Sequence, residues 1–406
     1  MRTGHIVFAF ALAVMTSNAV EPVSHAFAEP SHGPVDVIAY GAACDHVTDD
    51  APAINRALDA ARSIGYGDWS TQPVEISFPG NGKCLIKATL NFTGFKYVGV
   101  HVRGGYLLCQ TRGAPCIDAL GSRQLRFDGL TLVGDRTLEP TIGIQIGIVN
   151  RSEGADGHLF EEVAVTGYFS IAAYYNFASE VTQWVRPYIL NLDAGNSYAV
   201  ILDGYDHWNI ASPFVAQTAG RDLARSFNDN LFVGGYIQSN GMVGTMWIAG
   251  TGRLRFDQTY SSNDAAHNVV LWFKDNDYFD NNNSAIFDVH FETPNVTDTF
   301  LLTGPATAPL IRGFRYATEQ AFQASNSVFA IDPAASIRSV SVSDLDIGIG
   351  MVAPNDKNSA PRLFDDPAKW SVSGRVSLPA PNFWTEPASF SGLLCTGMRC
   401  MFRGGP

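Results

Sequence analysis

Short apolar strands recur along the chain. Each opens with a bulky apolar residue, passes through a polar turn pair and continues in alternating apolar residues, as in Phe127–Leu132 and Phe160–Val165. Alternation of this kind predicts a strand with one buried side. The segment returns at Trp184–Ile189, Trp208–Pro213, Phe232–Ile237, Phe256–Tyr260, Phe287–Phe291 and Ile337–Val342.

The spacing of these segments indicates a solenoid. Equivalent positions are 33, 24, 24, 24, 23, 31, 25 and 26 residues apart when the alignment uses Leu130, Val163, Pro187, Ala211, Gly235, Gln258, Val289, Phe314 and Val340. A fixed step with occasional insertions is typical of a repeat fold. No helical pattern lies between the segments, so each repeat is a coil of short strands.

A second series of strands accompanies the first. It comprises Gly143–Gly147, Ile171–Phe177, Tyr198–Gly204, Thr245–Gly250, Val269–Lys274, Thr299–Gly304 and Val328–Asp332. Two strand columns in step predict a parallel β-helix. We therefore predict an all-β fold, a right-handed parallel β-helix of about ten coils.

One short helix is expected before the first coil. Thr48–Asp50 offer N-cap side chains and Pro52 suits a first turn. An apolar stripe at helical spacing follows, formed by Ile54, Ala57, Leu58 and Ala61. Because the ends of a strand stack expose unpaired edges, this helix is predicted to cap the first coil.

The domain organisation follows from these elements. Residues 1–19 read as a signal peptide, with a possible alternative end at residue 28, because Arg2 precedes the apolar run Ile6–Val14. Residues 35–370 form the β-helix domain, and 371–406 a C-terminal capping segment of the same domain. We expect a secreted or periplasmic protein with no membrane association after signal removal.

The cysteines point to disulfides. Six follow the signal, an even number in an oxidising compartment. The close pairs Cys109/Cys116 and Cys395/Cys400 indicate two local loops and leave Cys44 with Cys84, although sequence alone does not fix the connectivity.

The charge narrows the class of partner. A formal net charge of −12 and a pI near 5.1 argue against nucleic acid, because phosphate binding needs a basic face. The same charge weighs mildly against a strongly anionic substrate. The sequence gives no indication of the oligomeric state.

The N-terminal region resembles the pectate-lyase-like superfamily, which includes rhamnogalacturonase and polygalacturonase relatives, epimerase-like proteins and phage tailspikes. The resemblance covers about residues 35 to 135. It rests on Asp36–Ala42, Asp45, Thr48–Asp50, Ala53–Ile54 and Ala57–Ala61, followed by Val74–Gly80 and Cys84–Ile86. It implies a parallel β-helix and indicates little about the chemistry, because members of this superfamily carry out many reactions. Cys44 and His46 stand where relatives usually carry Gly, and the Asp, His-Gly and Arg-Ile-Lys motifs of the polygalacturonase branch are missing.

The candidate catalytic residues are Asp257, Asp288, His290 and Glu292. Strands in a sheet lie about 4.8 Å apart, so aligned repeats bring Asp257 and Asp288 into one column, at the separation that retaining glycosidases use. Asp after a buried aromatic is also a common turn former, and Phe-Asp recurs at Phe127-Asp128. His290 and Glu292 project from the same side of the later strand and are candidates for proton transfer. In the same alignment, Gln238 and Ser261 match Glu292.

Other side chains are candidates for substrate binding. They are Asp203, His207, Trp208, Tyr236, Gln238 and Lys274, with Trp247 and Trp272 as further aromatic faces. A lyase needs a base and a cation that neutralises a uronate carboxylate, for which Lys274, Arg255 and Arg315 are conceivable. No resident metal is predicted. Ca²⁺ is the one conceivable cofactor, at Asp275, Asp277 and Asp280–Asn283, because it takes oxygen ligands. The segment lacks the Gly and Glu positions of an EF-hand, and a solvated loop is the favoured explanation.

Two classes of function remain open. One is a secreted carbohydrate-active enzyme that cleaves or modifies a polysaccharide, with glycoside hydrolase slightly favoured over polysaccharide lyase. The other is a noncatalytic polysaccharide-binding or adhesion protein, since one fold serves both.

Overall fold

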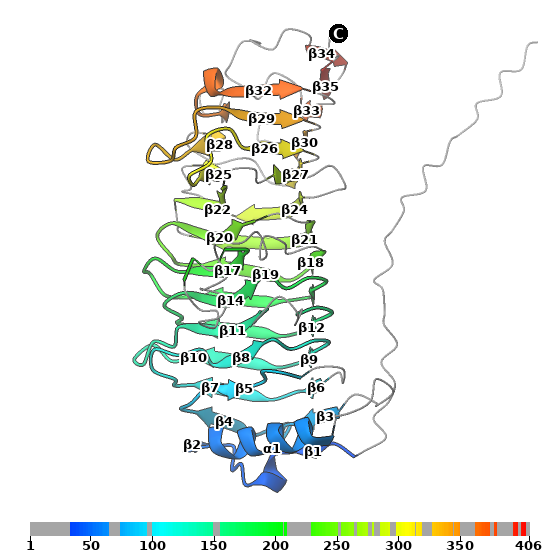
Figure 1. Cartoon of the computed structure of the whole chain (residues 1–406), viewed down its shortest axis with the longest axis vertical. Helices are drawn as coiled ribbons and strands as arrows, with labels where there is room; N and C mark the ends of the chain where they lie inside the picture. The colour runs from blue at the N-terminus through cyan, green and yellow to red at the C-terminus, as the bar shows by residue number, and fades with distance from the viewer. Residues whose placement is uncertain are drawn as a thin grey trace, which may run out of the picture.

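A computed structural model shows a parallel β-helix, the fold that the sequence predicts (Figure 1). It describes residues 33–64, 74–95, 100–148, 155–205, 207–208, 229–250, 253–263, 266–274, 278–279, 285–292, 298–312, 314–318, 327–343, 345–349, 362–373, 377–379, 393–396 and 399–402. The described part has about eight turns, slightly fewer than the ten expected.

Each coil has three strand faces rather than the two predicted columns. Face 1 contains β1 (Val35–Asp36), β3 (Val74–Ser77), β6 (Val100–Arg103), β9 (Arg126–Asp128), β12 (Leu159–Glu161), β15 (Gln183–Val185), β18 (Asn230–Val233), the first parts of β21 (Leu254–Asn263) and β24 (Ala285–Glu292), β27 (Phe314–Thr318), β30 (Asp346–Ile349) and β33 (Ser377–Pro379). Face 2 contains β2 (Asp45–Asp49), β4 (Lys83–Ile86), β7 (Tyr106–Cys109), β10 (Thr131–Gly134), β13 (Ala164–Gly167), β16 (Tyr188–Asn191), β19 (Tyr236–Ser239) and the later parts of β21 and β24.

Face 3 is the second strand series of the sequence, and all seven of its expected segments are strands. It contains β5 (Leu90–Asn91), β8 (Ile117–Leu120), β11 (Ile142–Gly147), β14 (Ala172–Phe177), β17 (Tyr198–Asp203), β20 (Gly244–Ala249), β22 (His267–Trp272), β25 (Asp298–Thr303), β28 (Ser327–Ile331) and β31 (Arg362–Phe364). In the C-terminal coils a four-stranded sheet follows, made of β23 (Tyr278–Phe279), β26 (Leu310–Arg312), β29 (Val340–Ser343) and β32 (Trp370–Ser373). Val340 therefore lies outside the column in which the sequence alignment placed it, and Phe314 pairs with Ala285 rather than with Val289.

A left-handed residue turns the chain between face 1 and face 2. Gly129, Glu162, Arg186 and Gln258 occupy this corner with φ of 66°, 52°, 51° and 52°. The polar turn pair of the repeat is thus a corner that divides one expected strand into two. This corner accounts for the third face.

A stack of aromatic rings runs through the interior. Phe127 stacks on Phe160 with centroids 5.2 Å apart, and Phe160 stacks on Trp184 at 4.2 Å. Trp184 then faces Phe232 at 6.3 Å, because β15 pairs directly with β18 and β16 with β19. The prediction of a coil at Trp208–Pro213 is therefore wrong. Trp208 fits the repeat pattern in the sequence, but its ring is not part of the interior stack. Residues 209–213 lie outside the described part.

The N-terminal helix is confirmed as α1 (Ala51–Ile64), which lies across the first coils (Figure 1). Its predicted stripe is buried, with Ile54, Ala57 and Leu58 at 0% exposure. A 3-10 helix, η1 (Val37–Tyr40), precedes it, and η2 (Pro367–Lys369) lies near the other end. Asp49 accepts a hydrogen bond from the amide of Ala51 at 3.2 Å, as a capping residue does.

Two of the three expected disulfides are present, Cys44–Cys84 and Cys109–Cys116. The remaining cysteines lie directly opposite each other in an antiparallel hairpin of β34 (Leu393–Thr396) and β35 (Arg399–Phe402). The side chains of Cys395 and Cys400 lie outside the described part. β35 also pairs with β33, so the hairpin extends face 1 at the C-terminal end (Figure 1).

Candidate functional site

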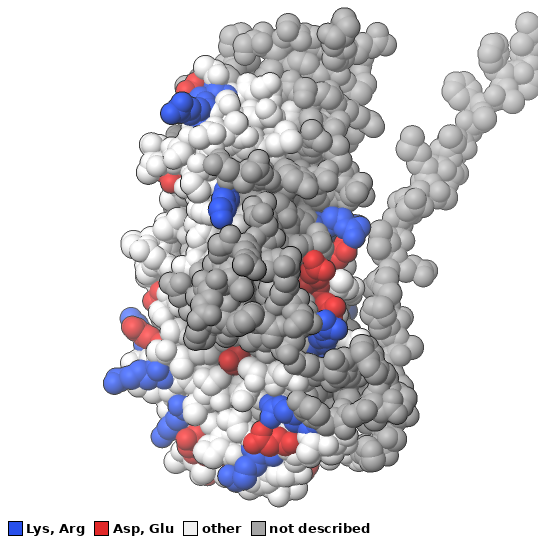
Figure 2. Space-filling view, viewed as in Figure 1, with Lys and Arg blue, Asp and Glu red and all other residues white. Residues whose placement is uncertain are grey.

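Asp257 lies on face 1 within a ladder of surface ion pairs. Its Oδ2 lies 2.6 Å from Nη2 of Arg255. Earlier coils carry similar pairs, Arg126 with Glu161 at 3.1 Å and Arg186 with Glu162 at 2.8 Å. Figure 2 shows acidic and basic side chains side by side along the right of the view. The described contacts of Asp257 thus match the structural role that recurs on this face, and Arg255, one of the conceivable lyase cations, is engaged there.

The other three candidate catalytic residues lie on β24, and their side chains are outside the described part. Phe256 pairs with Phe287. Asp257 and Asp288 are the residues that directly follow this pair in their two strands. His290 pairs with Tyr260 and Glu292 with Ser262, on face 2. Asp257 and Asp288 therefore occupy neighbouring coils before the corner, while His290 and Glu292 follow it.

At this corner the repeat alignment made from the sequence is shifted by one residue relative to the strand pairing in the structure. Gln238 pairs with Ser262, and Ser262 with Glu292, so Ser261 is not the equivalent residue. Ser261 is fully buried instead. The shift arises because β21 contains the corner residue Gln258, whereas β24 passes from Phe287 to His290 in one residue fewer.

Tyr236 and Gln238 lie on face 2, away from the other candidate binding residues. The Tyr236 ring stacks on Tyr188, with centroids 5.4 Å apart and planes at 19°. The hydroxyl of Tyr236 hydrogen-bonds Oε1 of Gln238. Tyr188 is 46% exposed, so this pair forms a small aromatic patch on face 2.

Asp203 and His207 form a hydrogen-bonded pair at the end of β17 on face 3. Nδ1 of His207 lies 2.8 Å from Oδ1 of Asp203, and the His207 amide donates to Oδ2 at 2.7 Å. The Tyr205 amide donates to Oδ1 at 2.9 Å, and the Tyr175 hydroxyl to Oδ2 at 2.8 Å. Asp203 is 0% exposed, whereas the His207 side chain is 22% exposed. The carboxylate thus fixes an imidazole that reaches the surface.

The local sequence explains this turn. Asp side chains commonly accept hydrogen bonds from backbone amides two or more residues later, and Asp203 accepts those of Tyr205 and His207. In the neutral tautomer that donates from Nδ1 to Oδ1 of Asp203, Nε2 of His207 keeps its lone pair. The pair can therefore accept a proton at Nε2.

Aromatic rings surround the imidazole. The His207 ring lies 4.2 Å from the ring of Trp272 and 5.5 Å from that of Trp247, edge to face. Trp208 lies 6.0 Å from His207 and 5.4 Å from Trp247. The structure thus brings together Asp203, His207 and Trp208 with the two tryptophans proposed as sugar platforms.

Lys274 lies at the edge of the same group. Its Nζ is 5.3 Å from the centre of the Tyr205 ring, and Tyr205 lies 6.0 Å from His207. We define the aromatic-histidine site as Asp203, Tyr205, His207, Trp208, Trp247, Trp272 and Lys274. Tyr205 and Tyr175 were missed in the sequence. Tyr175 could have been found from strand pairing, because Phe177 pairs with Asp203 and Tyr175 points outward two residues earlier.

Part of the outer side of face 3 is buried. Tyr175 and Ile201 are 0% exposed and Val270 is 1% exposed, although all three point away from the interior. They form a second hydrophobic cluster with Trp208 and Trp247. Trp208, which follows β17, thus packs on the outside of the coil, and the aromatic-histidine site is anchored by this cluster.

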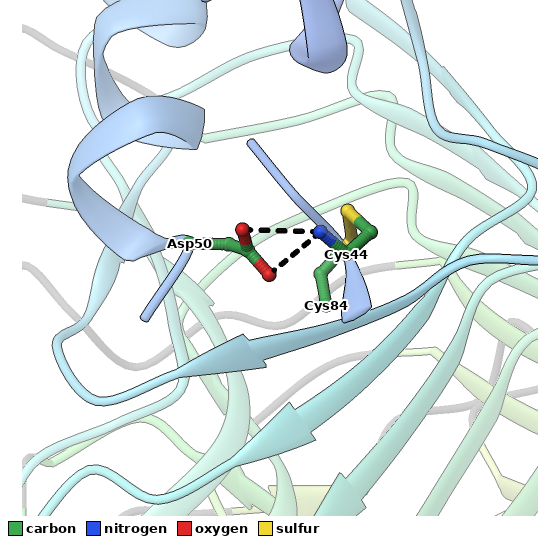
Figure 3. A group of neighbouring side chains, drawn as sticks. All are labelled: Cys44, Asp50 and Cys84. Atoms are coloured by element: carbon green, nitrogen blue, oxygen red, sulfur yellow. Dashed lines mark hydrogen bonds between the residues drawn. A yellow bond between two sulfur atoms is a disulfide. The ribbon is translucent and has the colours of Figure 1, made fainter. Parts of the chain in front are cut away.

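One group of metal-type ligands occurs among the described residues. Ligand atoms of Cys44, Asp50 and Cys84 lie within 4.8 Å of one another (Figure 3). The two sulfurs are bonded to each other, so neither can act as a thiolate ligand. Asp50 instead accepts hydrogen bonds from the amides of Ala43, Cys44 and Leu85. The conceivable Ca²⁺ ligands at 275–277 and 280–283 lie outside the described residues.

Over the residues described above, no helix has the length and apolarity needed to cross a membrane. No protein-family model matches the sequence, and no curated protein matches it.

Several solved structures are similar to this chain. ORF18 of Geobacillus virus E2 is 12% identical with a TM-score of 0.40 and covers 84% of this chain, which spans 60% of the length of that protein. The A-module of the Azotobacter vinelandii mannuronan C-5 epimerase AlgE4 is 15% identical, with a TM-score of 0.42. The match covers 84% of this chain and 100% of that module. A hyperthermoactive exopolygalacturonase from Thermotoga maritima is 11% identical, with a TM-score of 0.40. The match covers 86% of this chain and 91% of that enzyme. Similarity at this level identifies neither a substrate nor a reaction.

Proposed function

We propose that this protein is an exported polysaccharide-modifying enzyme whose aromatic-histidine site performs elimination at a uronic acid unit. The observation that carries the proposal is the hydrogen bond of 2.8 Å between His207 and Asp203, surrounded by tryptophans on face 3. Imidazole exchanges protons near neutral pH, and aromatic rings offer apolar faces to sugar rings.

In this reaction His207 acts as the base. Its Nε2 takes the proton from C5 of the uronate, the freed electron pair forms the C4–C5 double bond, and the C4–O bond breaks. The leaving oxygen takes a proton from water. Lys274 would neutralise the uronate carboxylate, which stabilises the charge that develops on it. Asp203 does not touch substrate and is a positioning residue.

Hydrolysis by two carboxylates has less support, which reverses the order expected from sequence. Asp203 is buried and already accepts four hydrogen bonds. Asp257 is ion-paired with Arg255. Noncatalytic binding is the second candidate, and the density of aromatic side chains around His207 favours it.

The test is incubation of the purified protein with a panel of uronate-containing and neutral polysaccharides. Reducing ends and the ultraviolet absorbance of unsaturated uronates are followed together. Elimination predicts both signals. Reducing ends alone would indicate hydrolysis, and retention on polysaccharide without either signal would indicate a binding protein.

Matched variants locate the reaction. His207→Ala should lower turnover about 100-fold or more, the usual contribution of general base catalysis, with an unchanged unfolding temperature. Asp257→Ala and Asp288→Asn should keep near-normal turnover. Loss of turnover in Asp288→Asn with full activity in His207→Ala would move the chemistry to β24 and contradict the proposal.

A further inference from the structure

A groove opens on the outer side of face 3, toward the N-terminal end from the aromatic-histidine site. Its volume is about 610 Å³, and its floor is a ladder of three polar residues on successive strands, Asn91, Asp118 and Gln145. Thr93 and Thr141 line it as well. None of these positions was singled out in the sequence.

The floor of the groove holds a buried acceptor that no described residue donates to. Gln145 is 3% exposed, and its Oε1 has no hydrogen-bond partner among the residues that the structure describes. Buried polar atoms are almost always hydrogen-bonded, so an unpartnered one that lines a cavity is a place where a ligand hydroxyl can donate. This observation is independent of the groove's shape.

Asp118 sets the charge of the groove. Burial raises the pKa of this carboxyl, while the Gln145 amide and the Leu120 amide, which donates to Oδ1 at 3.1 Å, oppose the rise. An anionic ligand would bring a second carboxylate against it, which is unfavourable. A hydroxyl can donate to Asp118 and to Oε1 of Gln145 alike.

The walls of the groove also carry apolar residues. Pro115, Ile142 and Ile171 line the groove beside the polar floor. A sugar ring presents hydroxyls at its edge and C–H groups on its faces, which matches a polar floor with apolar walls.

We propose that the groove over Asn91, Asp118 and Gln145 is a binding site for a neutral, hydroxyl-rich sugar unit of a polysaccharide. The floor continues toward His207, since Gln145 pairs with Tyr175, whose hydroxyl donates to Asp203. Three strand spacings separate β8 from β17, about 14 Å. One polysaccharide with neutral and uronic units can therefore span both sites; this connection rests on the proposed function, whereas the neutral-sugar site does not.

Calorimetric titration tests the site, with neutral gluco-, galacto- and manno-oligosaccharides and oligogalacturonate as probes. The wild-type protein is expected to bind at least one neutral series. Gln145→Met should weaken that binding about fivefold to tenfold, the value of one or two hydrogen bonds. Asp118→Asn, which keeps the side-chain shape, should improve the affinity for oligogalacturonate relative to neutral sugars.

Controls separate this site from the aromatic-histidine site. His207→Ala should leave the affinity for short neutral oligosaccharides within twofold, whatever its effect on turnover. Thermal unfolding shows whether the Gln145→Met variant is folded. If it is not, the binding measurements on Asp118→Asn test the proposal instead. Absence of neutral-sugar binding to the wild type at millimolar concentration, or wild-type affinities in both groove variants, would overturn the proposal. Tighter wild-type binding of oligogalacturonate that Gln145→Met weakens would overturn the assignment to neutral sugars.

Discussion

Asp50 and Asp203 are both buried carboxylates that accept backbone hydrogen bonds, but the groups that they hold in place differ. Asp203 holds a histidine that reaches the surface. Asp50 holds the turn at Cys44 (Figure 3) and also accepts a hydrogen bond from the amide of Leu85 in β4. The sequence predicted Thr48–Asp50 as caps of the helix. Asp49 has that role, but the Asp50 side chain points back to the disulfide.

Replacement of Asp50 should destabilise the N-terminal end. Asp50→Ala leaves the buried amides of Cys44 and Leu85 and the partly buried amide of Ala43 without their acceptor, and we expect a loss of about 3 kcal/mol or more in the free energy of unfolding. Denaturant unfolding measures it. Asp45 is the matched control, because it also accepts bonds from Val47 and Thr48 but is exposed. Equal effects of Asp45→Ala and Asp50→Ala would contradict this role.

His158 should make the fold sensitive to acid. Burial lowers the pKa of His158 from 6.5 to about 3. The folded imidazole stays neutral where the unfolded one binds a proton, so its contribution to stability is complete above pH 6.5 and is lost as pH falls from 6.5 toward 3. At pH 5 the loss is about 2 kcal/mol.

Denaturant unfolding at pH 7 and pH 5 tests this contribution. His158→Asn should lose less stability between the two pH values than the wild type, by about 2 kcal/mol. Comparison with the variant is necessary because burial raises the pKa of Asp118 and Asp298, which acts in the opposite direction. An unchanged pH dependence in the variant would contradict the assignment.

At the scale of the strand, the corner between face 1 and face 2 depends on close backbone packing. Gly235 has φ of 77°, and a Cβ there would lie 2.3 Å from the carbonyl oxygen of Pro187. Gly234 also has positive φ, 62°, but its nearest neighbour would be Arg186 Cγ at 3.9 Å. Both glycines supply a left-handed conformation, and only Gly235 also lacks space.

This difference predicts unequal effects of the same substitution. Gly234→Ala should cost about 1–2 kcal/mol, the usual penalty of a left-handed non-glycine residue. Gly235→Ala should destabilise further, because the strand of the preceding coil must shift. Thermal unfolding of the two variants measures the difference. Equal unfolding temperatures would show that close packing at this corner is unimportant.

The longer strands of face 3 were predictable because they are mainly apolar and their outward residues are buried as well, as in β14 and β17. The corner was not, since Glu162, Arg186 and Gln258 adopt left-handed conformations that no composition rule marks. Trp208 misled the alignment because a bulky aromatic at a 24-residue step looks the same in sequence whether its ring enters the interior stack or packs outside. Only the direct pairing of β15 with β18 separates the two.

For the whole molecule, the three faces divide the candidate chemistry. Face 1 carries ion pairs, face 2 carries the stacked Tyr188 and Tyr236, and face 3 carries the aromatic-histidine site and the groove. The sequence proposed Asp203, His207, Trp208 and Lys274 as candidate binding residues, and these four lie close together in the structure. It also grouped Tyr236 and Gln238 with them, because a repeat alignment that merges two faces cannot tell which side a residue occupies.

The central claim is that polysaccharide binds on face 3, and amide hydrogen exchange with and without a bound oligosaccharide tests it most directly. The oligosaccharide used is one that the panel shows to bind. We expect slower exchange in the Asp203–Trp208 segment and in β20 and β22, with β16 and β19 unchanged. Slower exchange confined to β16 and β19 would place the ligand on the tyrosine patch of face 2 and contradict the account.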